Sequence, residues 1–123
     1  MPNSNRISRN RYLAYRQQDG LCIYCSLRLY LGTLDEVATQ LGISKRAAFL
    51  VQCTAEHLLA RQDGGTDAAG NIAAAHWYCN HQRHRRSAAP SPEAFGQFVQ
   101  RRVASGKWWP DVLKFALSRL GWK

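Results

Sequence analysis

Apolar residues spaced three and four positions apart predict helices in several parts of the chain. One helix should follow the capping residue Thr33, run from residue 34 to about 41, and end at Gly42. Two further amphipathic helices are predicted over residues 93–103 and 108–120. A short helix over residues 8–20, with arginines on its exposed face, completes this helical set.

Between the helical segments, the pattern predicts a β-hairpin followed by another helix. Residues 49–54 look extended, residues 61–71 are rich in turn formers, and a second strand should begin at Asn71. The helix should start near Tyr78. Residues 33–52 allow two interpretations, a helix-turn-helix or a helix, a Gly-Ile-Ser turn and a strand from about Ala48.

The charge of the chain narrows the functional classes. Lys and Arg outnumber Asp and Glu by 17 to 8, and the excess lies at the two ends, whereas residues 32–79 carry slightly more acid than base. Such a basic protein suits a polyanion or an anionic surface. The sequence has no run approaching the ~18 apolar residues of a membrane span. We therefore expect no membrane partner.

Two pairs of metal-ligating residues share the same spacing. Cys22 and Cys25 form one pair, and His76 and Cys79 form the other. Three thiolates and one imidazole make a tetrahedral shell for a structural zinc ion. Two alternatives stay open, that Cys53 replaces His76 or that the first pair is merely buried. With no apolar leader before them, the cysteines indicate a reducing cytoplasm, bacterial or phage-like.

The central segment resembles the HNH (ββα-metal) endonuclease family. The resemblance rests on Glu56-His57, Gly64-Gly65, Asn71 and Cys79-Asn80, in the family's order and with compatible gaps. It covers roughly residues 22–86. It implies an α+β fold, in which a small ββα-metal hairpin-helix core is stapled by zinc and flanked by N- and C-terminal helices. Residues 1–123 would form a single domain, with a helical insertion at about 33–47 and a helical extension at about 91–123.

The family's pattern implies a role for each polar residue of the motif. His57 would be the general base, since an imidazole of pKa ~6.5 is partly neutral at physiological pH. Glu56 and Asn80 would hold a divalent ion, Mg²⁺ or Mn²⁺, with His84 as a third ligand or a phosphate contact. Asn71 would fix the loop by hydrogen bonds. His84 as a solvated residue of a basic run and Asn71 as a simple turn former are the alternatives.

These roles predict an enzyme that hydrolyses phosphodiester bonds in DNA, expected to be double-stranded, and leaves 5′ phosphates. Arg83, Arg85 and Arg86 would neutralise backbone phosphates without reading sequence. The sequence allows a homodimer. The alternative is a zinc-stapled nucleic-acid-binding module that does not cleave. Trp108 and Trp109 suit either core packing or stacking on bases.

Overall fold

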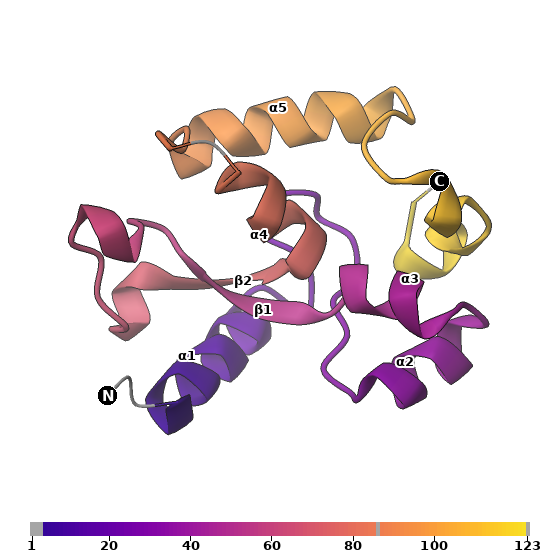
Figure 1. The fold of residues 1–123 in the computed structure, drawn as a ribbon, viewed down its shortest axis with the longest axis horizontal. Coiled ribbons are helices and arrows are strands. Elements are labelled where there is room, and N and C mark those ends of the chain that lie inside the picture. Colours follow the sequence, from indigo (N-terminus) through magenta and orange to yellow (C-terminus); the bar gives the residue numbers. More distant parts are fainter. Residues whose placement is uncertain (1–3, 86, 123) are drawn as a thin grey trace.

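A two-stranded antiparallel sheet forms the centre of the computed structural model, which describes residues 4–85 and 87–122 (Figure 1). Strand β1 (Cys53–His57) pairs with β2 (Ile72–His76), and Cys53 lies opposite His76. Helix α1 (Ser4–Gln17) packs below this hairpin in Figure 1, and α4 (Trp77–Arg83) packs above it. Because an isolated hairpin is marginally stable in water, the sheet depends on these helices. The predicted α+β class and ββα order are confirmed.

The remaining elements surround this core. Beside the start of β1 lies a pair of short helices, and a long helix crosses above α4 (Figure 1). Short 3₁₀ turns occupy the hairpin loop. These elements are α2 (Leu34–Leu41), α3 (Lys45–Leu50), η1 (Arg61–Asp63), η2 (Ala69–Asn71), α5 (Pro92–Ala104) and η3 (Asp111–Leu120).

Residues 33–52 form two helices joined by a tight turn. Thr33 and Glu36 make a reciprocal capping box at the start of α2, and Gly42 ends the helix with φ 67°, a conformation that suits glycine. Ser44 then caps α3 through the backbone N–H of Ala47. The strand expected from Ala48 is therefore wrong, since the chain stays helical until Leu50. Of the two interpretations, the helix-turn-helix outline agrees with the structure.

The C-terminal segment matches the prediction in its first half. Ser91 caps α5 through the N–H of Ala94. The predicted helix over 108–120 begins later, at Asp111, and is a 3₁₀ helix. Trp108 and Trp109 are 6% and 8% exposed, so both indoles pack in the core. The core-packing interpretation of this pair is confirmed.

Side chains close both edges of the two-stranded sheet. On the β2 edge, the Gln18 amide accepts from the N–H of Ala74 and donates to its carbonyl. On the β1 edge, Asn80 donates to the carbonyl of Ala55, and Arg83 donates to that of His57. Backbone groups that would otherwise lack partners are thus satisfied without a third strand.

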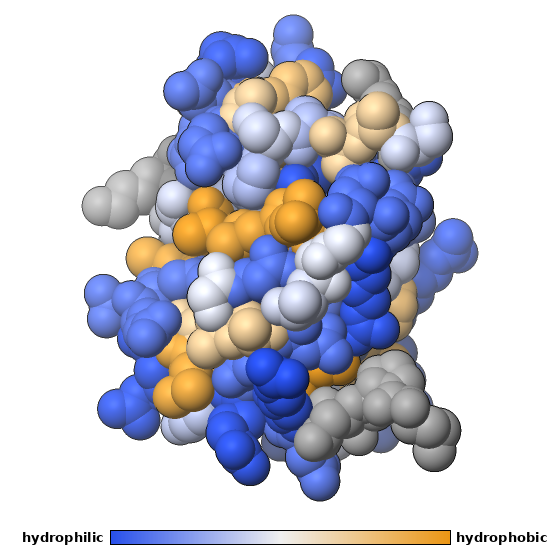
Figure 2. Space-filling model, turned by 90° about the vertical axis from the view of Figure 1, so that its left-hand side faces the viewer, coloured by the Kyte–Doolittle hydropathy of each residue, from blue (hydrophilic) through white to orange (hydrophobic). Residues whose placement is uncertain are grey.

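The face on the hairpin-loop side is mostly hydrophilic, with a patch of apolar side chains across its middle (Figure 2). Among the helices that the structure describes, none combines the length and the apolar character needed to cross a bilayer.

Candidate active site and metal centre

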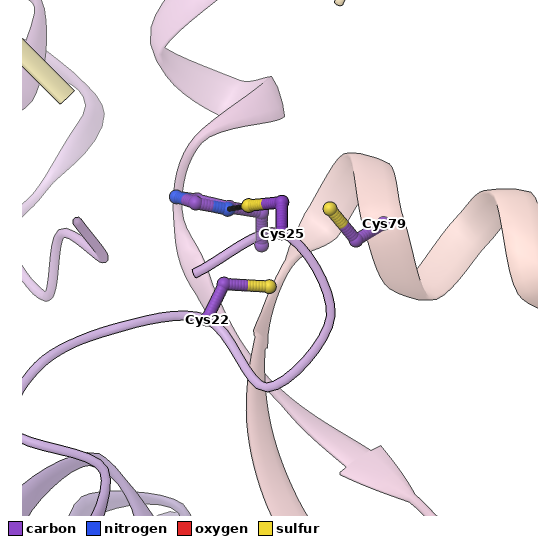
Figure 3. Close-up of side chains that lie close together, drawn as sticks. Cys22, Cys25 and Cys79 are labelled. Atoms are coloured by element: carbon purple, nitrogen blue, oxygen red, sulfur yellow. Dashed lines mark hydrogen bonds between the residues drawn. The ribbon is translucent and has the colours of Figure 1, made fainter. Parts of the chain in front are cut away.

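Four buried ligand atoms converge where the N-terminal turn meets the hairpin. The nitrogen and sulfur atoms of Cys22, Cys25, His76 and Cys79 all lie within 4.8 Å of one another. Figure 3 shows the three sulfurs turned toward one point, two from a loop and one from the first turn of α4. The set is the S₃N donor set that zinc prefers, so the residues fit a structural zinc ion.

Neighbouring groups orient these ligands, and the cysteines favour the positively charged form of His76. His76 faces Cys25 Sγ through Nδ1 at 3.2 Å, while its Nε2 lies 2.6 Å from the carbonyl oxygen of Arg28. This outer contact fixes the ring as in many metal-bound histidines. The indole N–H of Trp108 donates to Cys79 Sγ. Although burial lowers the pKa of His76, the thiolate charges of Cys25 and Cys22 raise it to about 10.

Cys53 lies outside the ligand cluster. Its thiol is buried, and burial raises its pKa to about 12, so it stays protonated. His76, not Cys53, completes the four-ligand set. The alternative that Cys22 and Cys25 are merely buried is also disfavoured, because their sulfurs face the second pair.

Glu56 is fully buried at the end of β1 and is surrounded by donors. Its Oε2 accepts from the Tyr24 hydroxyl at 2.8 Å and from Arg83 Nη1 at 3.3 Å. Its Oε1 lies 2.8 Å from His84 Nε2. The arginine balances the buried carboxylate, which would otherwise be very costly. Burial and the neighbouring Glu56 charge raise the pKa of Tyr24, so its hydroxyl remains a donor.

The contact between Glu56 and His84 also has the spacing of two metal ligands. Two ligands ~2.1 Å from an octahedral ion and at right angles are ~3.0 Å apart. Asn80 lies on α4, one turn before the C-cap residue His84, and donates through Nδ2 to Thr54 Oγ1 and the Ala55 carbonyl. Within residues 4–85 and 87–122, no third His, Cys, Asp or Glu joins this pair.

His57 turns away from Glu56, as neighbouring residues of a strand do. Its Nε2 lies 2.8 Å from Asp67 Oδ1, and Arg61 contacts both groups. The hydrogen bond with His57 is the largest cause that lowers the pKa of Asp67, so this residue is a carboxylate. In the described part of the chain, no hydrogen bond joins His57 Nδ1 to a partner, and none joins the ring to His84.

Asn71 holds the loop between the strands. Its Nδ2 donates to the carbonyls of Leu59 and Thr66, and its Oδ1 accepts from the N–H of Leu59. Gly65 lies in the same turn, where a Cβ atom would collide with the Leu59 carbonyl oxygen. The loop-fixing bonds expected of Asn71 are therefore present, and the turn cannot accept a side chain at Gly65 without moving.

The structure describes two of the three arginines that were predicted to contact phosphates. Arg83 is only 4% exposed, and its guanidinium donates to the carbonyls of Pro90, His57 and Leu58. Its expected surface role does not agree with this burial. Arg85 is exposed and donates to Gln82. Arg86 lies outside the described residues.

Two residues near this site escaped the sequence analysis. Tyr24 lies between the two cysteines of the first pair, so the turn that carries the zinc ligands also places a hydroxyl on Glu56. Asp67 follows the glycine pair in a segment whose sequence pattern indicates only a loop. The one available signal for Asp67 was an acidic residue ten positions after His57, which is weak.

Comparison with known proteins supports the resemblance. Residues 42–86 match the family model of HNH endonucleases. No curated protein and no solved structure matches the chain. The match indicates nuclease-type activity for a segment that includes β1, the loop, β2 and α4. The chain thus contains a segment, residues 42–86, that matches the HNH endonuclease family, and a cysteine and histidine cluster capable of binding zinc, two of whose four ligands lie in that segment.

Proposed function

We propose that this protein is a metal-dependent endonuclease that hydrolyses phosphodiester bonds in double-stranded DNA. The observation that carries the proposal is the 2.8 Å contact between Glu56 Oε1 and His84 Nε2. It lies within the HNH segment, where the end of β1 meets the end of α4. The carboxylate is buried and ordered by Tyr24 and Arg83, as a preorganised site requires.

A divalent ion, Mg²⁺ or Mn²⁺, would be held by Glu56, by His84 and by the amide oxygen of Asn80. Asn80 lies on α4 and His84 caps the end of this helix four residues later, so the two side chains project from the same side. When bound, such an ion neutralises negative charge on the phosphate and the leaving oxygen. Glu56 supplies the anionic oxygen that hard cations prefer.

His57 would take a proton from the attacking water. With the Nε2 proton donated to Asp67, the lone pair of the neutral ring lies on Nδ1. As the water oxygen bonds to phosphorus, Nδ1 accepts a water proton, and Asp67 stabilises the imidazolium that forms. The bond from phosphorus to the 3′ oxygen breaks, and the 3′ oxygen takes a proton from solvent, which leaves a 3′ hydroxyl and a 5′ phosphate.

Positive charge on the protein would hold the substrate. The net charge of +9 supports binding to a polyanion, and Arg85 is exposed near the end of α4. None of the four cysteines, all of which lie in the described part of the chain, forms a disulfide, which supports a reducing compartment such as the cytoplasm.

A plasmid cleavage assay with two histidine variants tests the function. We expect the zinc-loaded wild type to cut or nick plasmid with added Mg²⁺ or Mn²⁺ and to be inactive without them. His57→Ala should lower the rate at least ~100-fold, since a general base contributes about that much. His81→Ala removes an exposed histidine that stacks on Trp77 and should leave the rate unchanged.

Two results would contradict the proposal. One is equal cutting by the wild type and His57→Ala. The other is stable DNA binding by the folded wild type with no cleavage under either metal, which would favour the non-cleaving binding module.

A further inference from the structure

A pocket of about 560 Å³ opens between α4 and α5, and the proposed cleavage reaction does not use it. Its volume is within the range of small-ligand sites. Arg83 forms part of its wall and also contacts Glu56, so the pocket adjoins the candidate active site. Its lining includes the aromatic side chains of Tyr78, Phe98 and Trp108 and, besides Arg83, the basic side chains of Arg85, Arg102 and Lys107.

The aromatic side chains form one cluster along the pocket. The Trp108 ring packs edge-on against Tyr78 and Phe98, with centroids 5.2 Å and 6.1 Å away. Trp108 is fixed in the core, and Tyr78 donates its hydroxyl proton to the Trp108 carbonyl. Phe98 remains 43% exposed. An exposed ring backed by fixed rings offers a planar ligand a surface on which to stack.

The basic side chains give the pocket an uncompensated positive charge. Arg85 donates only to the neutral Gln82, and Arg102 donates to the backbone carbonyl of Lys107. Neither these two arginines nor Lys107 forms an ion pair within the described part of the chain, and no acidic side chain appears among the pocket's described lining residues. The Arg102 guanidinium lies 6.0 Å from the Phe98 ring centroid, so cation and ring are adjacent.

We propose that this pocket binds a nucleotide, with the base stacked on Phe98 and the phosphate held by Arg85, Arg102 and Lys107. A ligand that carries an aromatic ring beside an anionic group matches the adjacent aromatic rings and unpaired cations of this pocket. The source can be a free nucleotide or an unpaired nucleotide of a strand, since bases inside a duplex have both faces covered. The second source rests on the proposed function and makes the pocket a subsite beside the cleaved bond.

Titration with deoxyadenosine monophosphate, without divalent cations, tests the pocket independently of cleavage. We expect saturable binding by calorimetry and quenching of tryptophan fluorescence through Trp108. Arg102→Gln should weaken binding about tenfold, as loss of a charge-assisted hydrogen bond does. Its control, Arg101→Gln, removes the neighbouring exposed charge outside this pocket and should bind like the wild type.

A second pair of variants tests stacking. Phe98→Ala should weaken binding about tenfold, which is the usual effect of removing an aromatic ring under a base. Phe115→Ala is the matched control, because that ring is 93% exposed and does not line the pocket. Deoxyadenosine and inorganic phosphate, each lacking half of the ligand, should bind more weakly than the monophosphate.

The outcomes distinguish a free nucleotide from a nucleotide of a strand, and they distinguish failure of this proposal from failure of the proposed function. A stronger effect of Phe98→Ala on a gapped oligonucleotide than on a full duplex supports a strand nucleotide, whereas an effect on the monophosphate alone supports a free one. The pocket assignment would be overturned if neither the monophosphate nor the gapped oligonucleotide bound. It would also be overturned if Arg101→Gln weakened binding as much as Arg102→Gln, or if phosphotyrosine bound as tightly as the monophosphate. Plasmid cleavage that depends on His57 would still stand in that case, so the two proposals fail separately.

Discussion

The contact between His57 and Asp67 favours one of the two neutral forms of the histidine ring. A carboxylate 2.8 Å from Nε2 favours the tautomer that carries its proton there. The other ring nitrogen is then the basic one. In serine proteases an aspartate holds a catalytic histidine in the same way. Asp67 is therefore a positioning residue for the proposed reaction.

Replacement of Asp67 by Asn should lower the cleavage rate at pH 7 by about 10- to 100-fold, because an amide can donate to Nε2 and impose the wrong tautomer. Asp67→Glu should restore part of the rate. Asp63→Asn, an exposed acid in the same loop, is the control. An equal loss of rate in Asp67→Asn and Asp63→Asn would contradict the positioning role of Asp67.

At the scale of single residues, local sequence patterns predicted the metal ligands better than the hydrogen-bond partners of the other polar side chains. The zinc ligands could be found because two pairs share one spacing. Arg83 could not be placed, since a run of arginines looks the same whether its members face water or, as here, bond to the carbonyls of His57 and Leu58. Asp67 meets His57 only through the path of the loop, which residue types do not encode.

The hairpin loop depends on its glycine pair and on Asn71. Gly64 has φ 95°, and Gly65 packs its backbone against the Leu59 carbonyl. The Asn71 amide then links Leu59 to Thr66 across the loop. Asp67 follows directly, so the turn determines where the carboxylate meets His57.

Gly65→Ala should destabilise the fold by about 1–3 kcal/mol, because the added methyl forces the backbone of residues 59 and 60 to move. The cleavage rate should fall as well, since Asp67 is displaced. Gly70→Ala is the matched control, as a Cβ there meets nothing within 4 Å. Urea unfolding of both variants measures the difference. Equal stability of the two would show that the loop adapts without cost.

Element types were predictable where caps and turn residues act locally. Thr33, Gly42 and Ser91 marked helix ends because each uses its own side chain or backbone freedom. The end of α3 was missed because Ala48 and Phe49 belong to a run that suits a strand. The Ser44 cap and the burial of Ala47 and Ala48 stabilise a helix here. Burial depends on tertiary packing, so the local sequence pattern does not indicate it.

Across the whole molecule, the metal centre connects the parts that the active site needs. Cys22 and Cys25 flank Tyr24, which bonds to Glu56, and Cys79 precedes Asn80 on α4. A zinc ion bound by these ligands would fix the N-terminal turn, the end of β2 and the start of α4 together. The small core gains from such a cross-link.

Removal of zinc by a strong chelator should lower the melting temperature by at least ~10 °C and abolish cleavage. Mg²⁺ alone should not restore the activity, whereas Zn²⁺ followed by Mg²⁺ should. Cys79→Ser should reproduce the loss, and Cys53→Ser, a buried cysteine outside the cluster, should keep its zinc. Circular dichroism and metal analysis measure both effects. Full zinc content in Cys79→Ser would contradict the ligand set.

The closed sheet edges limit how this chain can assemble. Gln18 occupies the outer backbone groups of Ala74, while Asn80 and Arg83 occupy those of Ala55 and His57. These bonds occupy the carbonyls of Ala74, Ala55 and His57 and the N–H of Ala74, which a strand added from a second chain would need. We therefore expect two copies of this protein to meet through helices or loops rather than through the sheet. The same bonds disfavour the edge-to-edge pairing that begins many aggregates.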